Sequence, residues 1–314
     1  MLDLEEFYLD LRSVLGPRAL KRVGRKVLGD DCLGLAGQLA YFTLFSMFPF
    51  LLSLAALVGL VIDDPASLLR ILAERMQSFL PKDAVRLLED YIELTLRGAA
   101  PSVLLFGVLA TFWSGWAAAD AIFKAVNRAY ELQETRPWWM LWGISILMVL
   151  GFALVIISLA LVVFGPEVGT YVQSLTGLPE AFLALWNLVR WSLAFLAVTV
   201  AHALLYYIAP NAKVPFKWIT PGGFAATVLI LLSSVGLDLW VAKFGHYNQI
   251  YGQIGAIMVL MLWLYVTGLM VLIGAEINAV LARMAEERKD TEIIQPQGSA
   301  NQSSTQISNT GEQP

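Results

Sequence analysis

The chain has 314 residues, of which 58% are hydrophobic and 15% are charged, with a mean hydropathy of +0.66 and a formal net charge of −4. An ordinary soluble domain is about one quarter charged, so this composition excludes that class. The negative balance also argues against a nucleic-acid binder, which carries a broad basic surface. One cysteine and two histidines exclude an internal disulfide, a thiolate metal cluster and a three-histidine zinc site.

Half of the chain lies in six segments of at least 20 residues without Asp, Glu, Lys or Arg. A helix of about 20 apolar residues crosses the hydrocarbon core of a bilayer, and lipid offers no partners for backbone N–H and C=O groups. The sequence therefore predicts an all-α, polytopic membrane protein with six transmembrane helices plus interfacial amphipathic helices. The charge-free segments are 32–62, 98–119, 137–166, 191–212, 218–237 and 244–275.

The first 31 residues are predicted to form a cytoplasmic, amphipathic, basic leader. Apolar residues at helical spacing precede a basic run, which is typical of an interfacial helix on anionic lipid. A solvated basic leader is the alternative. The segment is too charged to contain the apolar core of a signal peptide. The basic run consists of Arg18, Lys21, Arg22, Arg25 and Lys26.

Residues 32–283 are predicted to form the membrane domain, and residues 284–314 a disordered cytoplasmic tail rich in Ser, Gln, Asn and Thr. Pro49 predicts a kink in the first span because it removes a helix hydrogen bond. The segment 63–98 carries charges between its apolar positions, so it is predicted to be periplasmic and amphipathic. The predicted spans are approximately 33–62, 99–119, 138–164, 186–209, 218–242 and 252–282.

Lys and Arg between the spans predict the orientation. With both termini in the cytoplasm, 14 of these residues lie inside and 6 outside, in agreement with the positive-inside rule. The sequence thus favours a multi-pass protein of the bacterial inner membrane with a cytoplasmic N-terminus and C-terminus.

Polar residues gather at the cytoplasmic ends of the predicted spans. Burying them among lipid tails is costly unless they face partners or water, so we expect a shared, inward-facing polar vestibule. Each residue could instead cap a helix or reach the interface alone. The substrate-pathway candidates are Gln38, Tyr41, Asp120, Asn127, Tyr206, Asn211, Glu276 and Asn278.

Glu276 is the strongest candidate, because a carboxylate between Gly274, Ala275 and Ile277 has few other roles. It is expected to pair with a cation, carry a proton or orient a ligand amine. On the opposite side, Arg190 is predicted to pair with Asp238 across the fourth and fifth spans.

The sequence predicts no catalytic residue, cofactor site or metal site. Nucleophile-elbow, zinc-protease and phosphate-loop motifs are missing from it. The expected partners are membrane lipids and not nucleic acid, and the sequence leaves a homo-oligomer or an envelope partner open.

Several strings taken together resemble the YihY/BrkB inner-membrane family. They occur in the family's order between about residues 30 and 283, and their combination is specific. They are Leu39–Pro49 (LAYFTLFSMFP), Trp113–Trp116, Ala125–Tyr130, Tyr206–Asn211 (YYIAPN), Trp218–Gly223, Tyr251–Gly255, Leu262–Tyr265 and Leu272–Ala279 (LIGAEINA).

The resemblance implies a six-span inner-membrane protein. Members of the family are connected with serum resistance in a pathogen and, in one branch, with export of a lipid A precursor. An older ribonuclease BN label is regarded as a misassignment. The leading expectation is a transporter or flippase-like protein that moves a lipid-like or polar solute without ATP hydrolysis. The alternative is a scaffold or regulatory protein of the cell envelope.

Overall fold

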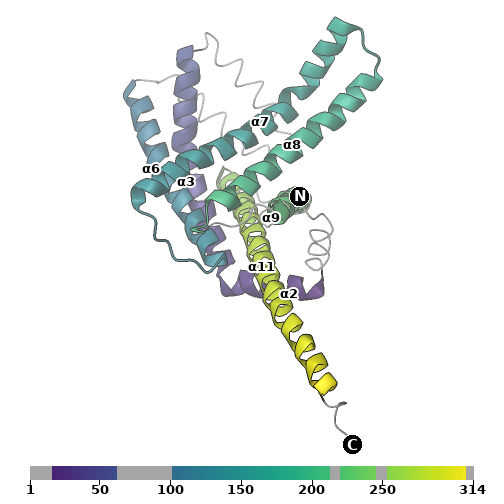
Figure 1. The fold of residues 1–314 in the computed structure, drawn as a ribbon. Coiled ribbons are helices and arrows are strands. Elements are labelled where there is room, and N and C mark those ends of the chain that lie inside the picture. The colour runs from purple at the N-terminus through teal and green to yellow at the C-terminus, as the bar shows by residue number, and fades with distance from the viewer. Residues whose placement is uncertain (1–15, 62–100, 213–219, 245–252, 309–314) are drawn as a thin grey trace, which may run out of the picture.

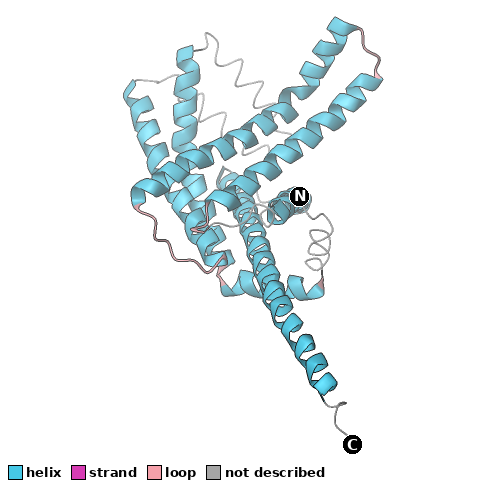
Figure 2. Cartoon of the chain, in the orientation of Figure 1, coloured by secondary structure: helices cyan, strands magenta, loops and turns pink. Residues whose placement is uncertain are grey.

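The computed structural model describes residues 16–61, 101–212, 220–244 and 253–308. Regular structure within these ranges is entirely α-helical (Figure 2), which confirms the predicted all-α class. The predicted segment 63–98 and the first half of the leader lie outside the described residues. The helices are α2 (Pro17–Gly29), α3 (Cys32–Val61), α6 (Pro101–Ala129), α7 (Trp138–Thr176), α8 (Ala181–Ile208), α9 (Thr220–Phe244) and α11 (Gln253–Ser308).

Each charge-free segment coincides largely with one long helix, from α3 to α11. In the described part of the chain, four helical segments are long and apolar enough to cross a membrane, and α3 and α7 contribute shorter apolar stretches. Six spans remain a prediction. The four segments are Leu105–Ala129, Ala181–Ile208, Pro221–Val241 and Ile257–Glu287.

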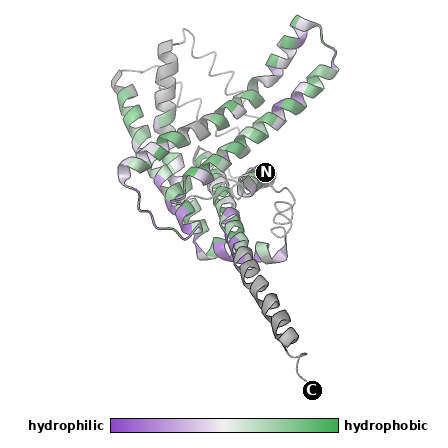
Figure 3. Cartoon of the chain, viewed as in Figure 1, coloured by the Kyte–Doolittle hydropathy of each residue, from purple (hydrophilic) through white to green (hydrophobic). Residues whose placement is uncertain are grey.

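The long helices pack as two pairs around a central helix. Figure 1 shows α3 beside α6 and α7 beside α8, and the two pairs diverge from a common end. Helix α11 packs against α9 and α3, and α2 lies across α11 at the common end of the pairs. Figure 3 shows hydrophilic residues gathered at this end, on α2 and near the end of α6.

Helix α11 differs from the expected disordered tail. The helix continues to Ser308, and its second half projects away from the other helices (Figure 1). The prediction of disorder rests on a composition too polar to form a packed core, and the projecting half of α11 extends away from that core.

Asp31 makes the sharp turn between α2 and α3. Its backbone adopts a left-handed conformation with φ of 55°, and its Oδ1 accepts the N–H of Gly34 at 3.3 Å. This bond satisfies one of the free N–H groups in the first turn of α3. The turn holds α2 against the ends of α3 and α11.

Two prolines lie inside long helices. Helix α3 continues through Pro49, so the helix is not interrupted there, and the kink stays a prediction. Helix α7 continues through Pro166 to Thr176, twelve residues beyond the predicted end of its span at residue 164. Gly177 ends α7 in the left-handed conformation, with φ of 67°, and its N–H donates to Gln173 O at 2.8 Å.

Arg190 of α8 compensates for Pro166. A proline has no N–H, so the carbonyl of Val162, four residues earlier, loses its helix donor. Arg190 Nη1 donates to this carbonyl at 3.3 Å, and its Nη2 donates to Asn187 Oδ1 at 2.5 Å. The predicted pairing of Arg190 with Asp238 is therefore wrong, because the unpaired carbonyl in the adjacent helix takes the guanidinium.

Candidate functional site: a buried charge cluster at one end of the bundle

Glu276 lies where α2, α3, α6 and α11 meet. Its side chain is on α11 and is 0% exposed. Oε1 accepts a weak hydrogen bond from Cys32 Sγ at 3.6 Å, and Oε2 lies 3.7 Å from Lys26 Nζ. Oε2 is buried without a hydrogen-bond partner. A carboxylate inside the packed part of the bundle therefore has one weak donor and one distant cation.

Lys26 connects α2 to three other segments. Its ammonium group donates to the carbonyl of Ala129, at the end of α6, at 2.8 Å and to Asp30 Oδ2 at 3.0 Å. Glu131 Oε1 lies 3.4 Å from the same nitrogen. The side chain of Lys26 is only 17% exposed. One lysine thus holds the ends of α2, α6 and α11 together.

Two further ion pairs attach α11 to its neighbours. Arg283 Nη2 contacts Glu131 Oε2 at 2.5 Å, and Arg22 Nη1 contacts Glu287 Oε2 at 2.9 Å. The hydrogen bond from Arg283 lowers the pKa of Glu131 below its ordinary value. These pairs are more exposed than Lys26, so each stabilises the fold only slightly.

A second polar group joins α6 to the end of α8. Asn127 is buried; its Oδ1 accepts the N–H of Asn211 at 2.7 Å, and its Nδ2 donates to Glu134 Oε2 at 2.8 Å. Asn211 Nδ2 donates to Gln133 O at 2.8 Å and to Thr135 Oγ1 at 2.9 Å. Two predicted site residues, Asn127 and Asn211, are therefore in direct contact.

Arg136 completes this second group. It donates to both oxygens of Glu134, at 2.8 and 2.6 Å, and to the carbonyl of Ala209 at 2.8 Å. Its guanidinium lies over the ring of Phe123, 5.6 Å from the centroid. The hydrogen bonds from Arg136 lower the pKa of Glu134 below its ordinary value of 4.5.

We expect this pair to make stability depend on acidity. A carboxyl whose pKa is lower in the folded chain contributes stability that is present above its unfolded pKa and is lost as pH falls through its folded pKa. The melting temperature of the detergent-solubilised protein should therefore fall on acidification below about pH 4.5, and Glu134→Gln should remove part of that dependence. Glu180→Gln, at the exposed start of α8, is the control. Identical pH profiles for wild type and Glu134→Gln would contradict this interpretation.

Tyr206 and Asn278 are packed between α8, α9 and α11. Tyr206 Oη donates to the carbonyl of Val271 at 2.6 Å, and Asn278 Oδ1 accepts the N–H of Gly222 at 2.7 Å. Both side chains are fully buried. They join helices through backbone groups in this arrangement.

Gln38, Tyr41 and Asp120 lie apart from these residues. Gln38 and Tyr41 occupy an exposed face of α3, where the ring of Tyr41 stacks on Phe45. Asp120 pairs with Lys124, one turn along α6, at 2.5 Å. The structure thus brings five of the eight predicted residues to one packed end of the bundle and leaves these three outside it.

The charged partners of the cluster were not among the sequence candidates. Lys26, Asp30, Glu131 and Arg283 lie just beyond the charge-free segments, where charged residues are common. In the sequence, Tyr130 stands out only as the last residue of the string Ala125–Tyr130. Burial raises the pKa of Tyr130, and the nearby charge of Glu276 adds to the effect. In the sequence these charged residues are marked only by their position near the ends of the predicted spans, and this position does not show which residues they contact.

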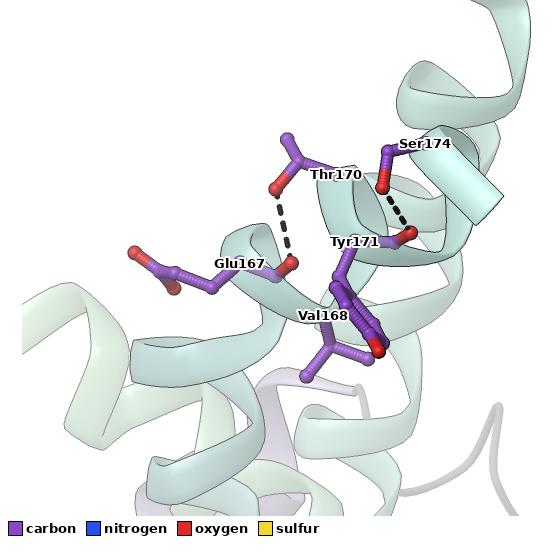
Figure 4. Close-up of a pocket in the computed structure, with 5 residues that line it drawn as sticks. All are labelled: Glu167, Val168, Thr170, Tyr171 and Ser174. Carbon is purple, nitrogen blue, oxygen red and sulfur yellow. Dashed lines mark hydrogen bonds between the residues drawn. The ribbon is translucent and has the colours of Figure 1, made fainter.

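Away from the cluster, α7 carries an open depression of about 580 Å³. Figure 4 shows its lining residues, all from the end of α7 beyond Pro166. Only one helix lines it, so it is a surface feature and not an enclosed site. The lining consists of Glu167, Val168, Thr170, Tyr171 and Ser174.

Metal-binding side chains are not grouped in the described ranges, where no set of three or more His, Cys, Asp and Glu residues could hold an ion.

Comparisons with known proteins place the chain among bacterial membrane proteins. It is 33% identical over 250 residues to YfkH of Bacillus subtilis, described as ribonuclease-like, covering 78% of this chain and 88% of that protein. It is 30% identical over 278 residues to a UPF0761 membrane protein of Alkalilimnicola ehrlichii, covering 85% and 58%. A UPF0761 membrane protein of Vibrio vulnificus is 31% identical over 271 residues, covering 83% and 81%. No solved structure matches.

The family described as Virulence factor BrkB matches residues 23–295, which include the charge cluster and every long helix except the last part of α11. The match confirms the resemblance found in the sequence strings. The chain is a membrane protein that belongs to the BrkB virulence factor family (YihY/BrkB).

Proposed function

We propose that the protein is an inner-membrane transporter or flippase-like protein that moves a lipid-like or polar solute without ATP hydrolysis. In this proposal the six long helices are the spans, and both termini are cytoplasmic. The observation that carries it is the full burial of Glu276 inside a predicted span. An ionisable residue at such a position is costly to keep and is typically functional.

The proposed mechanism opens and closes the end at which Glu276 lies. Lys26, Arg22 and Arg283 hold α2, the end of α6 and α11 together there. The pairs α3–α6 and α7–α8 diverge away from this end (Figure 1). A carrier alternates by moving one group of helices against another around a site. In this proposal the described arrangement is the state closed toward the cytoplasm, since Tyr206, Glu276 and Asn278 are buried in it.

A scaffold or regulatory role is the second candidate. Asn127, Tyr206 and Asn278 each bond a backbone group of another segment. Such bonds stabilise a fixed bundle and would serve a protein whose task is to hold partners.

Reconstitution into liposomes separates the two candidates. We expect wild-type protein to accelerate lipid scrambling or solute flux, and Glu276→Gln to reduce the rate while the protein remains folded. Glu286→Gln makes the same substitution about three turns further along α11, at an exposed position, and should retain most of the rate. Absence of flux with wild type would favour the scaffold, and full activity of Glu276→Gln would remove the proposed role of this carboxylate.

The outward face of α2 is proposed to lie on the anionic inner surface of the membrane. Leu20 and Leu28 are 74% and 71% exposed on one stripe of the helix, and Lys21 and Arg25 are exposed beside them. Apolar residues next to a basic row suit the boundary between acyl chains and headgroups. The inward face carries Lys26, so in this proposal one face of α2 contacts the helix bundle and the other contacts lipid.

We expect Lys21→Gln with Arg25→Gln to weaken the association of α2 with anionic lipid by about 1 kcal/mol per charge. The measurement is the fluorescence of an environment-sensitive probe at residue 24 in nanodiscs with and without anionic lipid. The double variant should lose most of the difference between the two lipid compositions. An unchanged response would support the solvated leader instead.

A further inference from the structure

Together with its charged neighbours, Glu276 forms a cluster of three acidic and two basic groups. Asp30 and Glu131 accompany it, whereas Lys26 and Arg283 are the cations. With every group ionised, the cluster carries one negative charge in excess. An unbalanced charge beside the buried Glu276 is costly, and uptake of one proton would neutralise it.

The contacts indicate which carboxylate takes this proton. Asp30 receives a hydrogen bond from Lys26 at 3.0 Å, and Glu131 is held by Arg283. Lys26 has three N–H groups; its contacts to Ala129 O and Asp30 are its hydrogen bonds, and Glu276 at 3.7 Å is the most distant of its oxygens. Glu276 is thus the least compensated of the three acids.

The remaining neighbours of Glu276 are neutral. Cys32 of α3 faces Oε1 at 3.6 Å. Tyr130 follows α6, and its buried hydroxyl group has no hydrogen-bond partner. Glu276 Oε2 is likewise buried without a hydrogen-bond partner. The hydroxyl group of Tyr206 in α8 donates its hydrogen bond to Val271 O and not to Glu276. The charged groups that face Glu276 directly are therefore the ammonium group of Lys26 and the carboxyl group of Asp30, and of these only Lys26 is a cation.

We propose that Glu276 is a proton-binding site, occupied in the closed arrangement, and that the proton is the ion to which transport is coupled. The coupling part rests on the proposed function; the proton site does not. Release transfers the proton from Glu276 to water on the cytoplasmic side and leaves a carboxylate that attracts Lys26. Lys26 can approach it only by weakening its bonds to Asp30 and Ala129, so proton release loosens α2 and the end of α6.

Infrared difference spectroscopy of the reconstituted full-length protein tests the site directly. We expect a carbonyl band of a protonated carboxylic acid that disappears as pH is raised. The band should be absent in Glu276→Gln and retained in Glu286→Gln, which changes an exposed carboxylate of the same helix. Cys32→Ala keeps the acid but removes its thiol donor, so the band should shift in frequency without being lost. A titrating band that is unchanged in both Glu276→Gln and Cys32→Ala, or no such band in wild type, would overturn the proposal.

Flux in liposomes with an imposed pH gradient distinguishes the two levels of the proposal. If Glu276 titrates in a protein that moves no solute, the proton site is supported and the transport function is contradicted. If flux does not depend on the pH gradient and Glu276 does not titrate, transport is supported and the proton site is contradicted. Flux that follows the gradient in wild type but not in Glu276→Gln supports both.

Discussion

Lys26→Met is expected to lower the free energy of unfolding by about 3–5 kcal/mol, because removing one partner of a largely buried ion pair leaves the other charge uncompensated. The substitution keeps the length of the side chain but leaves Asp30 and the carbonyl of Ala129 without their ammonium partner. The measurement is unfolding of the purified protein in mixed micelles of increasing SDS content.

A second substitution identifies the cause. Asp30→Asn in the Lys26→Met background should recover part of the loss, because it removes the stranded charge that lies closest to Lys26 in the wild type. Lys21→Met makes the same chemical change on the exposed face of α2 and should alter stability by less than about 0.5 kcal/mol. Equal losses for Lys26→Met and Lys21→Met would show that the buried cluster does not hold α2.

Gly222→Ala is expected to destabilise the contact between α9 and α11 by at least about 1–3 kcal/mol, the usual effect of overpacking. A methyl group at this position would overlap the carbonyl of Gly274 and the side chain of Asn278. The first of these contacts is backbone and cannot rotate away. The substitution should therefore separate the helices and break the bond from Gly222 N–H to Asn278.

Gly236→Ala is the matched control for this prediction. It lies on the same helix, and a methyl group there would meet nothing within 4 Å. Alanine also favours a helix over glycine by about 1 kcal/mol, so Gly236→Ala should be neutral or stabilising. Thermal unfolding of the two variants in the same detergent measures the difference. Similar melting temperatures would contradict the close approach of the two helices.

Helix positions could be predicted from the sequence because they depend on local hydropathy. Lipid excludes charge, so runs without charged residues had to coincide with long helices, as α3 and α8 do. Packing at the ends could not be predicted in this way. Lys26 and Glu276 are 250 positions apart, and nothing in their local sequences specifies that they meet.

Residue type and depth identify polar candidates in the sequence, and only some of these candidates meet in the folded chain. Asn127 and Asn211 share a hydrogen bond because the loop after α6 folds back onto the end of α8. Gln38 lies at a similar depth but on the opposite face of α3 from buried Ala36 and Ala40. Depth follows from hydropathy, whereas the direction of a side chain around its helix depends on which neighbours the helix has.

Pro166 shows how a tertiary contact overrides a local signal. Glycines and a proline after residue 164 are typical of a loop, yet α7 continues through them to Thr176. Arg190 supplies the missing donor to Val162, and the absence of a side chain at Gly165 leaves room for Arg190. A single sequence does not reveal that a guanidinium from the next helix will complete the hydrogen bonds of this one.

The length of α7 has a consequence for the reach of the protein. Thirty-nine residues of helix measure about 58 Å, almost twice the ~30 Å thickness of the hydrocarbon layer. A helix that starts at one membrane surface with Trp138 must either incline strongly or emerge on the far side. Glu167, Thr170 and Ser174 are exposed on its last turns, which favours emergence. Because Arg190 holds α8 to Val162, just before these turns, the ends of both helices would leave the bilayer together.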